Sequence, residues 1–416
     1  MINIEINEFT LDNGLKVVMC KNSRSPLCMV TMGFKVGSKN EKDGEHGIAH
    51  LIEHLMFSGS EHVPAGEFDV LLADRGGDSN AYTSYDITNF QIIIPSNSLE
   101  FAMWLDSDRY ISFGFTDESI AIQKDVVIEE KLQHIDNSPY GTVEEESSKR
   151  LFTDEGYRNT VIGFEKDIRN VTPEILKNFY NKYYNASNAV LTIVGDIEYD
   201  KTVKLVEKYY GDMPRGSRSE YDFKDNEITE EIVFDKKDNV NLSGRFMYYK
   251  LPRPGTREFY AATVLSGILT SGESSKLFKE LVIDKKLCNE IESFVIGLEY
   301  KGIFSIEAYI NKGVDEKLAY KAIDVVMEDI RNGNITDEDV ESIKNKLQLG
   351  TFFALQTNWN TADRLSKYKI IFDDATRINT EPDRIAEVKK SDVIRFAANY
   401  LKPEQRVALN YFPNEK

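Results

Sequence analysis

The chain of 416 residues is long enough for two domains, since a single domain typically holds about 100–200 residues. Its 41% hydrophobic and 29% charged residues are typical of a folded globular protein, and no apolar run approaches the ~18 residues that span a bilayer. The formal net charge of −18 disfavours nucleic acid and anionic lipid as partners, because both bind clustered basic surfaces.

The N-terminal segment and the cysteines indicate a cellular location. Met1–Asn7 lacks the basic stretch followed by an apolar stretch that marks a secretory signal. Cys20, Cys28 and Cys288 are an odd set and form no disulfide framework. We therefore expect a cytoplasmic protein, and a periplasmic one if the sequence begins at a mature N-terminus.

The first segments alternate between strand and helix signals. Phe9–Val18 contains the pair Asn13-Gly14 between two short apolar runs, which predicts a β-hairpin because Asn-Gly supplies the positive φ of a turn. Cys28–Val36 is the next strand-like run. In Gly47–Gly59 the apolar residues recur at helical spacing and predict an amphipathic helix.

Further along, Thr83–Pro95 alternates, becomes rich in β-formers and ends at a proline, which predicts a strand. Helices are expected over Ser98–Ser112 and Glu118–Asp136. Strands thus mix with long helices. This mixture predicts an α+β fold in which each domain packs a mixed or antiparallel sheet against helices.

An internal repeat predicts two homologous domains. Four residues of the first half recur at one constant offset in the second half, and in both copies a helix leads through a short turn into a strand: Val171, Phe179, Tyr183 and Val190 match Val388, Phe396, Tyr400 and Val407. A stretch rich in turn-forming residues predicts a linker over 214–230. We expect an N-terminal domain over 1–213 and a related C-terminal domain over 231–416.

Two of the five histidines, His50 and His54, lie four residues apart on the helix expected over Gly47–Gly59. At about 3.6 residues per turn both imidazoles project from one face, close enough to bind one metal ion. Glu53 precedes the second histidine, where a general base can take a proton from metal-activated water. This order of residues is that of the inverted zincins. An accidental grouping is disfavoured, because the apolar neighbours would bury these polar groups without partners.

A catalytic zinc site uses three protein ligands and leaves one position for water, so a third ligand is needed. No histidine follows His134, and a carboxylate is therefore expected. Within the helix Glu118–Asp136, periodicity alone leaves both Glu129 and Glu130 open. A purely structural zinc site is disfavoured, because such sites usually have four ligands, often cysteines, and no cysteine lies near the motif.

The motif and its surroundings resemble the pitrilysin/insulinase family of zinc peptidases, in particular its bacterial two-domain members that are similar to mitochondrial processing peptidases. The resemblance covers nearly the whole chain and is weaker in the second half. It is carried by the runs Gly44–Ser60, Gly76–Phe90, Asp125–Glu130, Asp136–Gly141, Ser187–Asp196, Gly211–Gly216 and Gly272–Leu281.

The resemblance implies a role for each matching residue of the first half. His50, His54 and Glu130 would be the ligands of one zinc ion, and Glu53 would be the general base. Extended, unfolded peptides would bind along an exposed strand edge, at Asn80, Ala81 and Tyr82. Where many relatives carry a second glutamate, this chain has Gln123, which can hydrogen-bond a ligand histidine without adding charge.

The resemblance also implies a partner. Active single-chain relatives carry an Arg and a Tyr in the second domain that hold the substrate, whereas this chain has Val282 and Asn289 at the matching positions. We therefore expect the metal-bearing subunit of a homodimer or heterodimer, with a zinc-less relative supplying the Arg and Tyr. The alternative is a non-catalytic scaffold subunit of the same fold, against which the intact metal motif argues.

Overall fold

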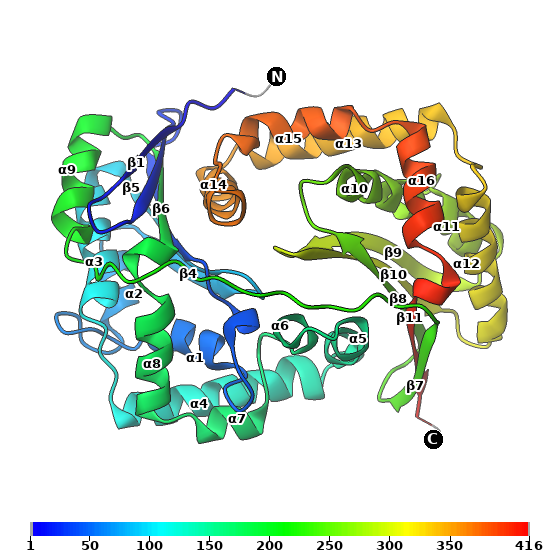
Figure 1. Cartoon of the computed structure of the whole chain (residues 1–416), viewed down its shortest axis with the longest axis horizontal. Coiled ribbons are helices and arrows are strands. Elements are labelled where there is room, and N and C mark those ends of the chain that lie inside the picture. The colour runs from blue at the N-terminus through cyan, green and yellow to red at the C-terminus, as the bar shows by residue number, and fades with distance from the viewer. Residues whose placement is uncertain (1–2, 415–416) are drawn as a thin grey trace. The chain divides into compact units, whose positions relative to one another are not determined.

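The computed structural model describes residues 3–414, and within them the chain forms two compact units. The first unit comprises the described residues up to Lys131 together with Asn159–Asp222 and Phe352–Thr380. The second comprises Leu132–Arg158, Phe223–Thr351 and the described residues from Glu381 onward. Each unit contains one sheet (Figure 1).

The sheet of the first unit has six strands in the order β1-β2-β6-β3-β5-β4. The predicted Asn-Gly hairpin is present: β1 and β2 pair antiparallel, and Gly14 between them has a φ of 92°. Within the described residues, strand β4 pairs with β5 alone and forms one edge of the sheet. The strands are β1 (Asn7–Thr10), β2 (Lys16–Lys21), β3 (Leu27–Phe34), β4 (Asp78–Thr83), β5 (Thr88–Pro95) and β6 (Ala189–Gly195).

The sheet of the second unit has five strands in the order β7-β11-β8-β10-β9. One pair, β7 with β11, is parallel, and the remaining pairs are antiparallel. The strands are β7 (Ile232–Asp238), β8 (Ser243–Pro252), β9 (Cys288–Gly297), β10 (Lys301–Ile310) and β11 (Val407–Pro413).

The two sheets share one topology. Five strands of the first sheet, β2-β6-β3-β5-β4, correspond in order to the five strands of the second, and each set has its one parallel pair at the same place. The predicted repeat falls on α8 followed by β6 in the first unit and on α16 followed by β11 in the second. The prediction of two related α+β domains with mixed sheets is therefore confirmed.

Helices cover both faces of the first sheet. α1 and α3 pack against β5 on one face, and α14 packs against β3 and β6 on the other. Because both faces are covered, β3 is an almost unbroken apolar run of buried residues. Figure 1 shows α14, in orange, beside β6. The helices of this unit are α1 (Ile48–Leu55), α2 (Glu67–Ala73), α3 (Leu99–Ile111), α4 (Asp117–Lys131), α7 (Glu165–Asn170), α8 (Pro173–Tyr183), α9 (Tyr199–Tyr210) and α14 (Asn358–Phe372).

The second sheet is covered in the same way. α10 and α16 pack against β8 on one face, and α5 packs against β8 and β11. The Arg150 guanidinium of α5 lies over the ring of Phe234, on the face that α10 leaves free. The helices are α5 (Val143–Leu151), α6 (Glu155–Arg158), α10 (Arg257–Thr270), α11 (Lys276–Phe278), α12 (Glu316–Arg331) and α16 (Lys390–Tyr400), while α13 (Asp337–Ala354) and α15 (Arg377–Ala386) cross the boundary between the units.

The compact units differ from the division expected from the sequence. One boundary does fall inside the predicted linker, at Asp222, and no helix or strand lies between α9 and β7. However, 132–158 joins the second unit and 352–380 joins the first. The reason is packing. Helix α5, in 132–158, packs against the second sheet, and helix α14, in 352–380, packs against the first sheet.

Candidate metal centre

Gly47 directly precedes α1, the helix that carries both motif histidines. Gly47 has a φ of 96°, and a Cβ at this position would lie 2.7 Å from the carbonyl oxygen of Ile162, so only glycine fits. The buried Glu41 carboxylate accepts hydrogen bonds from the backbone N–H groups of Gly47 and Ala49, both at 2.9 Å. Glu41 thus satisfies N–H groups that the first turn of a helix leaves free.

Helix α1 buries one face and presents the other to the site. Ile48, Leu51, Ile52 and Leu55 are fully buried in the core of the first unit. His50 and His54 project from the opposite face, with ring centroids 4.7 Å apart and ring planes at 89°. The spacing of the motif therefore places the two imidazoles side by side, as predicted from the helical period.

Helix α4 brings Glu130 to these histidines. Glu130 Oε2 lies 3.8 Å from His50 Nε2 and 3.4 Å from His54 Nε2. One ligand atom from each of the three residues lies within 4.8 Å of the other two. The adjacent Glu129, which periodicity left open, is exposed.

These distances and donor types suit one zinc ion. Bonds of about 2.0–2.2 Å in a tetrahedral site separate neighbouring ligand atoms by about 3.3–3.6 Å. Two imidazole nitrogens and a carboxylate oxygen form a donor set that zinc takes, and three protein ligands leave a fourth position open, as in catalytic sites. The geometry therefore fits the predicted ligands.

The protonation of His50 fits the same role. Burial, and then the charge of His54, lower the pKa of His50 to about 4, so its ring is neutral near pH 7. Neutral imidazole is the form that binds metal. At His54 burial favours the neutral ring, but the carboxylates of Glu130 and Glu53 outweigh it and raise the pKa of His54. Two negatively charged groups therefore favour a cation at this position.

The predicted general base, Glu53, is buried beside the histidines and accepts a hydrogen bond from a residue of the sheet. Burial raises the pKa of Glu53, and a hydrogen bond from Thr83 opposes this rise. Thr83 is the last residue of β4, and its hydroxyl donates to Glu53 Oε2. The sequence reasoning missed Thr83, although strand alternation from Ala81 places both side chains on one face of β4.

Beside Glu53 and His54 the surface contains a cavity of about 480 Å³. Phe57, Ala81 and Ile122 contribute apolar walls, and Asn80 and Gln123 also line it. The structure thus brings two of the three predicted substrate-binding residues, together with Gln123, to the metal site. Asn80 Oδ1 accepts the backbone N–H of Ala81 at 2.8 Å, a bond on the exposed part of edge strand β4.

The third predicted substrate residue, Tyr82, does not line this cavity. Its hydroxyl donates instead to Asp363 of α14 at 2.8 Å. Val282 and Asn289, which the resemblance matches to an Arg and a Tyr, lie in the second unit, Asn289 on the edge strand β9. The side chains of Val282 and Asn289 have neither the charge of an Arg nor the phenol group of a Tyr.

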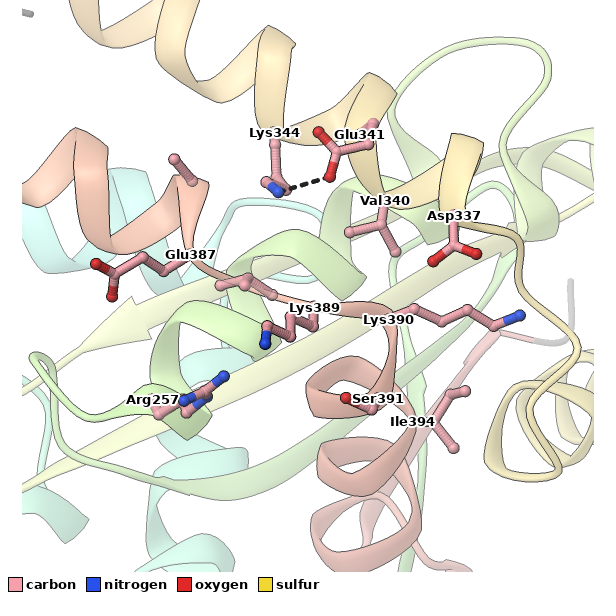
Figure 2. A pocket seen from close by; sticks show the side chains of 12 residues that line it. Arg257, Asp337, Val340, Glu341, Lys344, Glu387, Lys389, Lys390, Ser391 and Ile394 are labelled. Atoms are coloured by element: carbon pink, nitrogen blue, oxygen red, sulfur yellow. Dashed lines mark hydrogen bonds and ion pairs between the residues drawn. The ribbon is translucent and has the colours of Figure 1, made fainter.

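The second unit contains a larger cavity, of about 820 Å³, which holds none of the predicted site residues. Figure 2 shows side chains of both charges around it, among them the ion pair between Lys344 and Glu341 at 2.6 Å. Arg257 in this cavity pairs with Asp392 at 2.8 Å. Basic and acidic side chains both line it, and no histidine is among its lining residues.

Comparisons with known proteins identify relatives of both halves. Residues 16–164 match the family model described as Insulinase (Peptidase family M16), and residues 170–347 match the one described as Peptidase M16 inactive domain. The chain is 29% identical over 401 residues to the zinc protease PqqE of Helicobacter pylori, which covers 95% of this chain and 90% of that protein.

Solved structures agree with these matches. A protease from Helicobacter pylori superposes with a TM-score of 0.92 at 28% identity, covering 99% of this chain and 100% of the other. The periplasmic protease PqqL from Escherichia coli shares the fold, with a TM-score of 0.83 at 17% identity over 99% of this chain and 48% of that one. In the described part of the chain, no helix has both the length and the apolar character needed to cross a bilayer.

Proposed function

Because the chain belongs to the pitrilysin/insulinase (M16) family of peptidases, in its two-domain form, we propose that it is a zinc metalloendopeptidase of extended, unfolded peptides. His50, His54 and Glu130 would hold one zinc ion. Zinc, when bound, supplies a Lewis acid that makes a nearby water more acidic and polarises the scissile carbonyl group. The observation that carries the proposal is the convergence of these three side chains beside the buried Glu53.

Glu53 is placed to move the proton in this reaction. Its carboxylate takes a proton from the attacking water and returns it to the departing amine. The hydrogen bond from Thr83 fixes one carboxylate oxygen and leaves the other free for this exchange. Burial raises the pKa of Glu53, which makes its carboxylate a stronger base than an exposed one.

The substrate would bind as an additional strand on β4. Among residues 3–414 this strand pairs with β5 on one side only, so backbone groups of its other side would be available to a peptide. Such binding recognises the backbone of the peptide rather than its side chains and therefore favours unfolded segments. A side chain next to the scissile bond would enter the cavity between Phe57, Ala81 and Ile122.

The proposal is tested with an unfolded, fluorescence-quenched peptide library. We expect cleavage by the purified chain, loss of cleavage after treatment with a chelator and recovery on addition of zinc. A chain that binds zinc but cleaves no peptide under any condition, alone or with a partner, would support the scaffold function instead.

A dimer forms part of the proposal. Val282 and Asn289 cannot hold a substrate carbonyl as an Arg and a Tyr do, so a partner would supply these two groups. Mixing the chain with a zinc-less relative that carries them is expected to raise the cleavage rate. An unchanged rate, together with full activity of the chain alone, would contradict the need for such a partner.

The three free cysteines fit the cytoplasm, whereas the Escherichia coli protease that shares the fold is described as periplasmic. Fractionation of cells that produce the native protein, followed by detection with an antibody, distinguishes the two compartments.

A further inference from the structure

Tyr82 ties the edge strand β4 to a helix from the far end of the chain. Its hydroxyl donates to Asp363 Oδ1 at 2.8 Å, and Asp363 lies on α14. On the neighbouring strand, Asn89 is the direct partner of Tyr82. Asn89 Nδ2 donates to the Tyr82 hydroxyl at 3.3 Å and to Asp363 Oδ1 at 3.4 Å. The three side chains form a closed triangle of hydrogen bonds.

Lys367, one helical turn beyond Asp363, completes this group. Lys367 Nζ lies 2.9 Å from Asp363 Oδ2 and 5.0 Å from the centre of the Tyr82 ring. Burial, and then the Asp363 carboxylate, raise the pKa of Tyr82, so the phenol stays a neutral donor at physiological pH. Oδ1 of Asp363 thus accepts from Tyr82 and Oδ2 pairs with Lys367, so each oxygen of this carboxylate has its own partner.

The contact lies directly behind the proposed active site. Tyr82 and Thr83 are adjacent, so their side chains leave β4 on opposite faces. Tyr82 reaches α14 on one face, while Thr83 holds Glu53 on the other. Because β4 has only one neighbouring strand in the described part of the chain, its position depends on such side-chain bonds more than that of an inner strand.

We propose that Asp363 is a positioning residue for peptide hydrolysis, which acts through Tyr82 to fix strand β4 against the incoming peptide. This inference rests on the proposed function. It assigns a role in the reaction to α14, which lies at Asn358–Phe372, beyond both matched stretches, 16–164 and 170–347.

The fold itself does not depend on Asp363. Helix α14 is held by apolar side chains, since Ala362, Leu365 and Ile370 are buried in one cluster with Val18 and Val190 of the sheet. Asp363 lies at the margin of this cluster, and its side chain is 19% exposed. Exchange of Asp363 for leucine, which is of similar size and has no acceptor, therefore leaves the apolar packing of the helix in place.

The test compares Asp363→Leu, which removes the acceptor, and Tyr82→Phe, which removes the donor, with the wild type by steady-state peptide cleavage. We expect KM to rise about tenfold in each variant, the effect of losing one hydrogen bond to a charged group, while kcat changes less than about threefold. Zinc content stays at the wild-type value. Asp374→Leu is the matched control, because this carboxylate lies just beyond α14 and bonds to Thr376 instead.

Two further readouts separate positioning from a general loss of structure. In the double variant the rise in KM is expected to be no larger than in the worse single variant, since both changes break the same bond. Amide hydrogen exchange is expected to accelerate about tenfold in β4 and to stay unchanged in β2.

Unchanged KM and unchanged β4 exchange in Asp363→Leu and Tyr82→Phe would overturn the inference, as would additive effects in the double variant. If the wild type cleaves no peptide, the proposed function fails, and the exchange rates of β4 still decide whether Asp363 fixes the strand.

Discussion

The hydroxyl of Thr83 donates a hydrogen bond to the carboxylate of Glu53. This bond joins the edge strand β4 to α1, the helix of the proposed zinc ligands His50 and His54. The proposed general base is therefore oriented by the same strand that would receive the peptide. The motif on α1 is therefore only one part of the proposed catalytic arrangement, to which α4 adds Glu130 and β4 adds Thr83.

Replacing Thr83 by Val keeps the shape of the side chain and removes this donor. We expect kcat to fall about tenfold, because Glu53 loses the bond that orients it. Thr83→Ser keeps the hydroxyl and is expected to retain most of the activity. Peptide cleavage kinetics check both variants, and equal activity of the Val and Ser proteins would contradict the role of the hydroxyl.

Replacing Glu53 by Gln removes the base and keeps the size of the side chain. We expect cleavage to fall by about 10²–10⁴-fold, the usual contribution of a general base, while zinc remains bound. Metal analysis of the purified variant is measured beside its peptide cleavage. Cleavage at the wild-type rate would show that another group accepts the proton.

The buried carboxyl of Glu41 predicts a pH dependence of stability. Burial raises the pKa of Glu41 from 4.5 to about 7, although Gly47 and Ala49 donate backbone hydrogen bonds to it. Because the pKa is higher in the folded state, the stability that this group contributes is complete below pH 4.5 and is lost as the pH rises through 7. Glu41→Gln has a neutral side chain like the protonated carboxyl and is expected to reduce this loss of stability at rising pH.

Urea unfolding at pH 5 and pH 8, followed by tryptophan fluorescence, measures this effect. Both tryptophans of the chain, Trp104 and Trp359, lie in the first unit, where Glu41 is found. Glu61→Gln, at an exposed position, is the control. A Glu41→Gln protein that loses stability between the two pH values as steeply as the wild type contradicts the account.

Arg109 predicts a large effect on stability. Its guanidinium is buried, hydrogen-bonds Asp106 and lies over the rings of Phe57, Phe68 and Phe90. Arg109→Leu leaves the buried Asp106 carboxylate without its cation, and we expect a loss of about 3–5 kcal/mol in the free energy of unfolding of the first unit.

The same tryptophan signal measures the effect of Arg109→Leu. Arg75→Leu is the matched control, because Arg75 also lies over an aromatic ring, that of Phe101, but is exposed. A change of less than about 1 kcal/mol is expected there. Equal effects of the two substitutions would contradict the stabilising role of the buried pair.

The sequence predicted those features that depend on local pattern. Apolar residues at helical spacing placed α1, and the Asn13-Gly14 pair placed the hairpin of β1 and β2. The repeat of helix and strand correctly indicated two related sheets. At the end of α4 the prediction was too simple: the α-helix ends at Lys131, and Leu132–Asp136 continues as a π-helix in the second unit.

What the sequence did not predict depends on contacts between distant residues. The apolar side of α14 shows that the helix is buried but not against which sheet, so its packing on β3 and β6 could not be inferred. Thr83 and Asp363 carry no motif of their own. Their roles emerge only because the fold brings Glu53 and Tyr82 within hydrogen-bond distance of them.

The most direct test of the account is the zinc affinity of Glu130→Gln compared with that of Glu129→Gln. The two glutamates are adjacent on α4, but only Glu130 lies beside both imidazoles. Titration of the metal-free proteins with zinc is expected to show one site per chain in the wild type and in Glu129→Gln, and an affinity reduced at least about a hundredfold in Glu130→Gln. Equal zinc affinity of the Glu129 and Glu130 variants would contradict the three-ligand centre on which the proposed function rests.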